Sequence, residues 1–286
     1  MHTIVNNTRI WFDVDGAGLV ADGPVMRQRP ALVLLHGGPG FDHSWFKPAH
    51  GQLTDVAQIL YVDHRGNGRS GYSDPAHWTL AQWADDLRAL FDRLGVEKPV
   101  VLGLSFGGFV AQSYAARHRG HLGGLILSST AARFRVDRCL DTFLQLHGTR
   151  AHEVAEAFWT DVGDPQKVRA YLDECFPLYN PTPRPLEADK RSTFNPAMLH
   201  HFFRADGEGF RFDFRQSLAE LRCPTLVLAG DLDPVTPIAD SDDIAAAAPP
   251  SVLRYERFIG AGHGVGRDQP ERYFAVLREF LAGLAA

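Results

Sequence analysis

Ser105 lies within the sequence Gly-Leu-Ser-Phe-Gly, which begins at Gly103. The apolar residues 100–102 before it are typical of a β-strand, and the residues after Gly108 can continue as a helix. A serine on a sharp turn between a strand and a helix projects its hydroxyl above the sheet, where a substrate can reach it. The pattern therefore predicts that Ser105 is a nucleophile, and the alternative is an ordinary glycine-rich turn with a solvated serine.

A serine nucleophile needs a base, and imidazole suits this role because its unperturbed pKa of about 6.5 lets it accept and return a proton. The chain contains 13 histidines, so position must identify the base. His263 lies in a glycine-rich loop directly after the last predicted strand, residues 252–258. In this loop His263 is free to reach over the sheet, and we predict that it is the base.

A carboxylate that orients the histidine is expected to follow an earlier strand. Asp231 and Asp233 both follow the predicted strand at residues 224–229, and we favour Asp233 because it lies further along the loop. Asp231 is the competing candidate. The order Ser105, Asp233, His263 along the chain is that of the α/β-hydrolases and differs from the order in other serine enzymes.

The sequence His-Gly-Gly-Pro-Gly at residues 36–40 follows the unbroken apolar run 31–35. Such a run suits a strand that is buried on both faces, and the loop after it lies where open α/β sheets bind ligands. We predict an oxyanion hole formed by the backbone N–H groups of Gly38 and Phe106, each worth about 3 kcal/mol in the transition state. His36 is expected to fix this loop at the substrate site.

These residues must be positioned by a sheet, and strand and helix patterns alternate along most of the chain. Thr79 and Gln82 form a capping box that opens a predicted helix over residues 80–94, and a final helix is predicted at residues 270–284. Repeated β–α units with short connections indicate an α/β fold with a mainly parallel sheet and helices on both faces. Residues 16–30, rich in glycine, proline and charge, are predicted to form an exposed loop.

The alternation stops between residues 131 and 217, where helical patterns dominate. We interpret this segment as a mostly helical cap inserted into a core that comprises residues 1–130 and 218–286. Aromatic residues of the insert can belong to its core or line a pocket. Phe202 and Phe203 are the insert residues that we expect to contact substrate.

Composition excludes several other classes of protein. The 286 residues are 45% hydrophobic with a net charge of -5 and no basic tract, which argues against binding to nucleic acid or anionic lipid. The apolar runs are too short to span a membrane, and the first residues lack a signal-peptide pattern. The three cysteines, at positions 139, 175 and 223, form neither a metal-binding spacing nor a disulfide framework. We therefore expect a cytoplasmic protein without a metal site or cofactor, and find no signal for its oligomeric state.

The motifs together resemble the proline iminopeptidase group of the α/β-hydrolase superfamily. The resemblance rests on His-Gly-Gly-Pro-Gly at residues 36–40, Asp-x-Arg-Gly-x-Gly-x-Ser at residues 63–70, the acid in Gly-x-x-Asp at 230–233, and Gly-His at 262–263. It extends over nearly the whole chain and implies the α/β-hydrolase fold and acyl-enzyme chemistry. We expect the charges within residues 63–70 to brace neighbouring loops.

Two segments depart from that group. In that group the turn that carries the serine, called the nucleophile elbow, reads Gly-Gly-Ser-Trp-Gly-Ser. Residues 103–108 here read Gly-Leu-Ser-Phe-Gly-Gly. The peptidases also hold the substrate's free amine with a cap glutamate, and Leu199 stands at the matching position. Glu174, Glu187 and Glu208 are the acids that could replace that glutamate.

We predict a serine hydrolase that cleaves an ester, lactone or amide of a small molecule through an acyl-enzyme. The missing glutamate favours an esterase or lactonase. The shared motifs favour an aminopeptidase of the proline iminopeptidase type. A ligand-binding receptor that retains the hydrolase scaffold with little turnover is the alternative from a different class.

Overall fold

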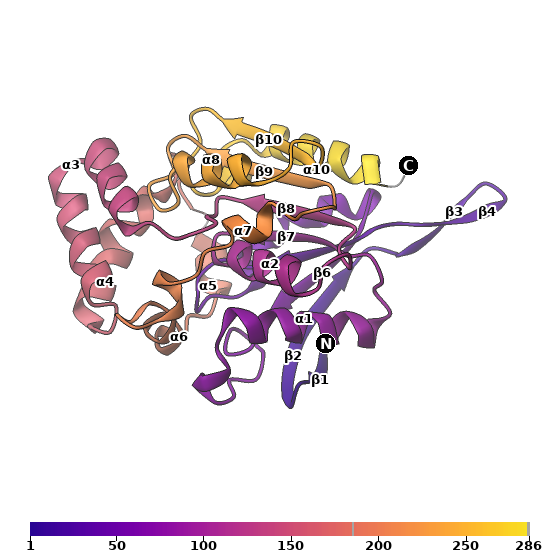
Figure 1. The fold of residues 1–286 in the computed structure, drawn as a ribbon, viewed down its shortest axis with the longest axis horizontal. Helices are drawn as coiled ribbons and strands as arrows, with labels where there is room; N and C mark the ends of the chain where they lie inside the picture. The colour runs from indigo at the N-terminus through magenta and orange to yellow at the C-terminus, as the bar shows by residue number, and fades with distance from the viewer. Residues whose placement is uncertain (185, 285–286) are drawn as a thin grey trace.

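The structure of the protein is a computed structural model that describes residues 1–184 and 186–284. Its centre is an eight-stranded sheet in the order β1-β2-β6-β5-β7-β8-β9-β10 (Figure 1). The strands are β1 (His2–Val5), β2 (Thr8–Asp15), β5 (Ala31–Leu35), β6 (Gln58–Asp63), β7 (Val100–Leu104), β8 (Gly124–Ser128), β9 (Thr225–Gly230) and β10 (Leu253–Phe258). β2 pairs antiparallel with β1 and β6, and the other neighbouring pairs are parallel. The predicted, mostly parallel α/β sheet is confirmed.

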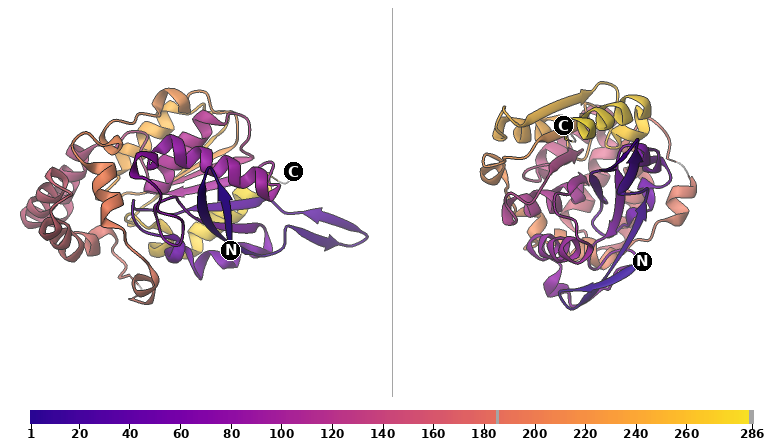
Figure 2. Two further views of the ribbon diagram at one scale, coloured as in Figure 1. Left: turned by 90° about the horizontal axis from the view of Figure 1, so that it is seen from below. Right: turned by 90° about the vertical axis from the view of Figure 1, so that its right-hand side faces the viewer.

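Helices pack on both faces of this sheet (Figure 2). The main ones are α1 (Leu80–Leu94), α2 (Phe106–Arg117), α8 (Ile238–Ala247) and α10 (Pro270–Leu284). Alternate residues of a strand point to opposite faces, so Val33 and Leu35 of β5 pack in the core layer of α1, α2 and α8, while Leu32 and Leu34 pack in that of α10. The central strands are thus apolar along their whole length because both faces are buried.

Helix α1 begins and ends where its local sequence predicts. The Thr79 hydroxyl accepts a hydrogen bond from the Gln82 N–H at 3.1 Å, which satisfies one of the unpaired donors of the first turn. Gly95 ends the helix with a φ of 69°, a left-handed conformation that glycine adopts without steric cost. The buried residues of α1 form one stripe toward the sheet, as the helical spacing predicts.

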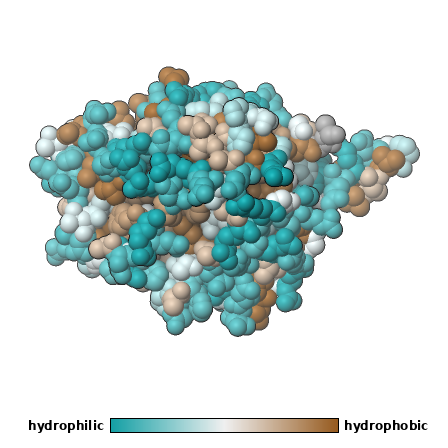
Figure 3. Space-filling view, viewed as in Figure 1, coloured by the Kyte–Doolittle hydropathy of each residue, from teal (hydrophilic) through white to brown (hydrophobic). Residues whose placement is uncertain are grey.

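One N-terminal segment differs from its predicted structure, and a second forms a strand for which no prediction was made. Residues 16–30, predicted as a loop, contain a hairpin of β3 (Leu19–Asp22) and β4 (Val25–Gln28) that projects from the body (Figure 1). Residues 2–5 form the edge strand β1. The hairpin has no buried apolar residue, and β1 buries only Val5, so neither segment shows the apolar alternation that reveals a strand in sequence. Figure 3 shows hydrophobic side chains on the projecting hairpin, where Leu19, Val25 and Met26 are exposed.

In the described ranges, five α-helices lie between β8 and β9 in sequence. They are α3 (Val136–Thr160), α4 (Pro165–Glu174), α5 (Leu186–Arg191), α6 (Pro196–Phe203) and α7 (Arg215–Leu218). Helices α3, α4 and α6 lie beyond the carboxyl ends of the parallel strands, whereas α7 packs beside α2 and α8 (Figure 1). Within α3 the backbone leaves the helical conformation at Gly148. Among the helices in the described ranges, none is both long enough and apolar enough to cross a membrane.

Candidate active site

Ser105 lies between the end of β7 and the start of α2, with φ 55° and ψ -119°. This positive φ is strained for a residue with a side chain, so the surrounding contacts must hold it. The Ser105 carbonyl accepts hydrogen bonds from the Gly108 N–H and the Thr130 hydroxyl, both at 2.8 Å. A Cβ at Gly103 would collide with the backbone of Gly107, which explains a glycine at that position.

Asp233 and His263 meet at the ends of β9 and β10. His263 Nδ1 lies 2.8 Å from Asp233 Oδ2, and the carboxylate is 1% exposed. The other carboxylate oxygen accepts from the N–H groups of Val235 at 2.8 Å and Thr236 at 3.0 Å, and the Thr236 hydroxyl donates to Oδ2 at 2.9 Å. Because Asp233 accepts the Nδ1 proton, Nε2 of the neutral ring is free to accept another.

Asp231, the competing acid, is directed elsewhere. Its Oδ1 accepts a hydrogen bond from the Gly260 N–H at 2.7 Å and so joins the loops that follow β9 and β10. Of the two aspartates that the sequence left open, it is Asp233 that contacts His263.

Sequence reasoning missed the contribution of Tyr179 to the histidine loop. The backbone N–H of His263 donates to the backbone carbonyl of Tyr179 at 2.7 Å. The two side-chain rings pack edge to face with centroids 5.3 Å apart. The Tyr179 hydroxyl lies 2.9 Å from that of Tyr171. No local pattern marks Tyr179, since its role depends on contact with a loop more than 80 residues away in the sequence.

The glycine-rich loop after β5 lies beside the serine. A Cβ built on Gly37 would be 3.5 Å from the Ser105 Cβ, and Gly38 has a φ of 137°, which a residue with a side chain rarely adopts. The Gly40 N–H donates to the Asn67 side chain at 2.8 Å and braces the loop. At the first position of α2 the Phe106 N–H has no carbonyl partner within the helix.

Two residues predicted at the substrate site, His36 and Phe202, lie outside the cavity. His36 is 2% exposed, donates from Nδ1 to the Gly37 carbonyl at 2.8 Å and accepts from the His64 N–H at 3.2 Å. Burial lowers the pKa of His36, so the ring is a neutral brace for the loop. Phe202 is fully buried and packs against Phe106 at 5.3 Å between ring centroids. Neither is among the residues that line the cavity at Ser105, so substrate contact by these two is not supported.

The charged motif at residues 63–70 braces loops, as predicted. Arg65 forms a buried ion pair with Asp86 of α1, with Nε 2.7 Å from Oδ2. Asp63 accepts from His43 Nδ1 at 2.7 Å and from the Arg69 N–H at 2.9 Å. These bonds anchor the loop after β6 and occupy the charged side chains of Asp63 and Arg65 in structural contacts.

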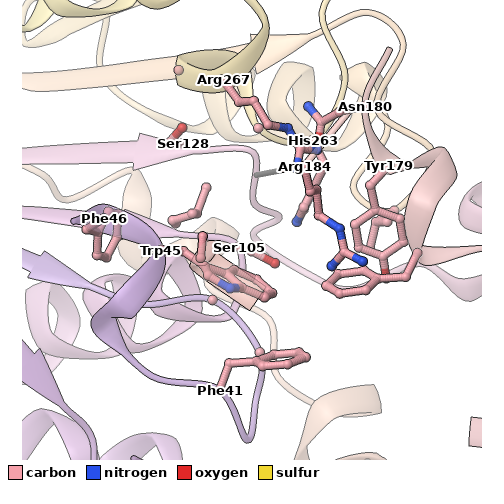
Figure 4. A pocket seen from close by; sticks show the side chains of 18 of the residues that line it. Phe41, Trp45, Phe46, Ser105, Ser128, Tyr179, Asn180, Arg184, His263 and Arg267 are labelled. Atoms are coloured by element: carbon pink, nitrogen blue, oxygen red, sulfur yellow. The ribbon is translucent and has the colours of Figure 1, made fainter. Parts of the chain in front are cut away.

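A cavity of about 370 Å³ opens at Ser105 and His263 (Figure 4). Gly37 and Gly38 line it on the core side, and aromatic residues of the insert, including Trp159 and Phe203, line it on the other. No hydrogen bond joins the side chains of Ser105 and His263, both of which lie in the described part of the chain. Such contacts are often loose before a substrate binds.

None of the three candidate amine-binding acids faces this cavity. Glu208 accepts from the Leu80 N–H at 2.8 Å and caps α1, Glu174 pairs with Arg150 on the surface, and Glu187 is exposed. Leu199, at the position of the peptidases' glutamate, does line the cavity. Leu199 thus presents an apolar side chain to the cavity.

Comparison with known proteins supports the fold and the chemistry. The family model described as "alpha/beta hydrolase fold" matches residues 30–266. The proline iminopeptidase PfmaB of Pestalotiopsis fici is 30% identical over 248 residues, which cover 82% of this chain and 85% of that protein. The proline iminopeptidase of Lactobacillus helveticus is 27% identical over 277 residues, 89% of this chain and 90% of that protein.

A solved structure of similar shape carries a different activity. A thermophilic esterase from Thermogutta terrifontis superposes with a TM-score of 0.70 and 27% sequence identity, over 100% of this chain and 97% of its own. The proteins similar to this chain thus include peptidases and an esterase. The residues that line the cavity must therefore distinguish between these two activities.

Proposed function

The chain belongs to the alpha/beta hydrolase fold family and is a hydrolytic enzyme, and from this premise we propose that it uses a Ser105–His263–Asp233 triad. The observation that carries the proposal is the 2.8 Å contact between His263 Nδ1 and the buried Asp233, with Ser105 and His263 lining one cavity. Ser105, on a strained turn, is the nucleophile, because strain of this kind presents a hydroxyl to a substrate.

In the proposed reaction His263 Nε2 takes the proton of Ser105 as its hydroxyl oxygen attacks the substrate carbonyl. The N–H groups of Gly38 and Phe106 donate to the oxyanion that forms. His263 then protonates the leaving group, and the acyl group remains on the serine. Water, activated by the same histidine, releases the acid. Each step uses only groups of the chain and water.

We propose that the substrate is an ester or lactone of a small molecule, bound under a cap formed by residues 131–217. Apolar side chains dominate the cavity wall, and Leu199 cannot pair with an ammonium group. An aminopeptidase is the second candidate, since two of the similar proteins are proline iminopeptidases. Amide bonds are cleaved by the same chemistry, so recognition of the amine distinguishes the two.

The test offers the purified protein short-chain aryl esters and a prolyl arylamide, with Ser105→Ala and the exposed-serine control Ser251→Ala. We expect ester turnover that Ser105→Ala abolishes and Ser251→Ala retains. Full turnover by Ser105→Ala would exclude the proposed nucleophile. Rapid arylamide cleavage would select the aminopeptidase, and tight binding without turnover would indicate a receptor.

A further inference from the structure

The charges that line the cavity are strongly unequal. Four cations and one carboxylate contribute to its wall: Lys47, Arg184, Arg191, Arg267 and Asp189. A wall of this composition favours an anion over a cation, because the field of a low-dielectric cavity is screened less than that of an open surface.

Two of these cations are already neutralised by ion pairs or screened by water. Lys47 Nζ forms ion pairs with Asp13 at 2.6 Å and Asp15 at 3.3 Å, which neutralise it. Arg191 is exposed and donates to the Lys47 carbonyl at 3.2 Å, so water screens its charge. Arg184 and Arg267 remain as the cations that act within the cavity.

Arg267, in α9 (Val265–Asp268), forms no ion pair with a carboxylate among the residues that the structure describes, although Asp268 and Asp189 are near enough to raise its pKa. Its guanidinium donates to Asn180 Oδ1, and the Asn180 amide is oriented by its own bond to Asp268 at 2.6 Å. The Nε of Arg267 is buried without an acceptor. Burial lowers the pKa of Arg267 to about 10, so the side chain is still charged near neutral pH. An unpaired buried donor on a half-buried cation is costly, and a bound anion that accepts from Nε relieves that cost.

Arg184 is only partly neutralised. Its guanidinium stacks on the Phe176 ring at 3.8 Å from the centroid, and Nη1 lies 3.5 Å from Asp189 Oδ1, longer than a charge-assisted hydrogen bond. Figure 4 shows Arg184 and Arg267 on the His263 side of the cavity, across from Ser105. Burial and then the charge of Arg184 lower the pKa of Arg267, whereas the carboxylates of Asp268 and Asp189 raise it. The two guanidinium groups therefore lie in one shared electrostatic environment.

We propose that Arg184 and Arg267 bind a free carboxylate of the substrate, so that preferred substrates are esters that carry a second, ionised carboxyl group. This inference rests on the serine hydrolase function proposed above. Guanidinium groups match carboxylates in shape and charge. The carboxylates of Asp189 and Asp268 offset part of the charge of the two arginines, so the site suits a monoanion better than a phosphate dianion. The apolar remainder of the cavity accommodates the carbon skeleton.

The experiment compares esters that differ only by a carboxylate in place of a methyl group. Monomethyl adipate is paired with methyl hexanoate, and 4-acetoxybenzoate with 4-methylphenyl acetate, so the carboxylate lies on the acyl or the leaving side. We expect kcat/KM of the wild type to favour the carboxylate in at least one pair. Arg184→Gln and Arg267→Gln should each reduce that ratio about tenfold, and Arg88→Gln, at an exposed arginine of α1, should leave it unchanged. A wild-type ratio of one or less in both pairs, or a ratio that both cavity variants retain, would overturn the inference.

Binding to Ser105→Ala separates this inference from the proposed function. Calorimetry with both ester pairs and inorganic phosphate needs no turnover and keeps both arginines in place. Preferential binding of the carboxylate ester in either pair supports the carboxylate site even if the wild type hydrolyses no ester, in which case the hydrolase proposal alone fails. Equal binding within both pairs, or tighter binding of phosphate, counts against the carboxylate site whatever the wild type hydrolyses.

Discussion

At Asp233 one side chain makes four hydrogen-bonding contacts, with two backbone N–H groups, one hydroxyl and the His263 ring. The backbone and hydroxyl bonds hold the carboxylate in one rotamer, so the histidine meets a fixed acceptor. Asp231, two residues earlier, bonds to Gly260 instead. The difference between two neighbouring aspartates comes from the conformation of the loop after β9, which turns one carboxylate inward and the other toward the loop after β10.

Asp233→Asn is expected to lower kcat/KM on an aryl ester by roughly 10³- to 10⁴-fold, because an amide can donate to Nδ1 and so hold the wrong histidine tautomer. Asp231→Asn is the matched control, and we expect a loss below about tenfold. Steady-state kinetics of both variants measure the difference. If Asp231→Asn shows the greater loss, the acid has been assigned to the wrong residue.

At the scale of elements, α1 links the sheet to the insert. Its first turn is capped twice, by the Thr79 hydroxyl on the Gln82 N–H and by the Glu208 carboxylate on the Leu80 N–H. The second bond joins α1 to the segment between β8 and β9. Burial raises the pKa of Glu208. The acid is thus used in packing two parts of the chain together and does not reach the cavity.

Thr79→Ala is predicted to lower the free energy of unfolding by about 1 kcal/mol, because one N–H of the first turn of α1 loses its acceptor. The kcat/KM of the folded protein should be unaffected. Thr149→Ala, at an exposed threonine in α3, is the control and should change stability by less than about 0.5 kcal/mol. Urea denaturation measures both, and equal losses would show that the cap contributes nothing.

At the scale of the whole molecule, the parallel sheet gathers loops from separate parts of the chain at one edge. Buried histidines support these loops as neutral groups. His50 lies between the Phe46 carbonyl at 3.1 Å and the Tyr273 hydroxyl at 3.0 Å, and burial lowers its pKa to about 4. Burial also lowers the pKa of His36 and of His64. All three must gain protons when the protein unfolds in acid.

Stability is therefore predicted to fall as the pH drops from about 6.5 to 4. The native state binds fewer protons than the unfolded state in this window, so acid favours unfolding, by up to roughly 3 kcal/mol from His50 alone. His50→Gln should flatten the dependence of the free energy of unfolding on pH, whereas His77→Gln, at an exposed histidine, should not. Urea denaturation at pH 7 and 4.5 measures the free energy of unfolding of each variant. If this free energy changes with pH by the same amount in both variants, the prediction is contradicted.

Local sequence determined the elbow at Ser105, the start and end of α1, the apolar strands of the sheet and the fold class. These features depend on neighbouring residues: glycine fits a sharp turn, a hydroxyl caps the N–H three residues on, and burial on both faces requires an unbroken apolar run. The roles of Ser105, His263, Gly38 and Phe106 in catalysis stay predictions that the geometry supports.

Only the tertiary structure decided which aspartate faces His263, that His36 and Phe202 lie outside the cavity, and that Arg184 and Arg267 lie within it. Each of these outcomes depends on how segments far apart in the chain pack. The charge of a cavity is a sum over such segments, and no spacing along the sequence encodes that sum. The reaction type could therefore be predicted from local motifs, whereas the proposed preference for an anionic substrate required the packed fold.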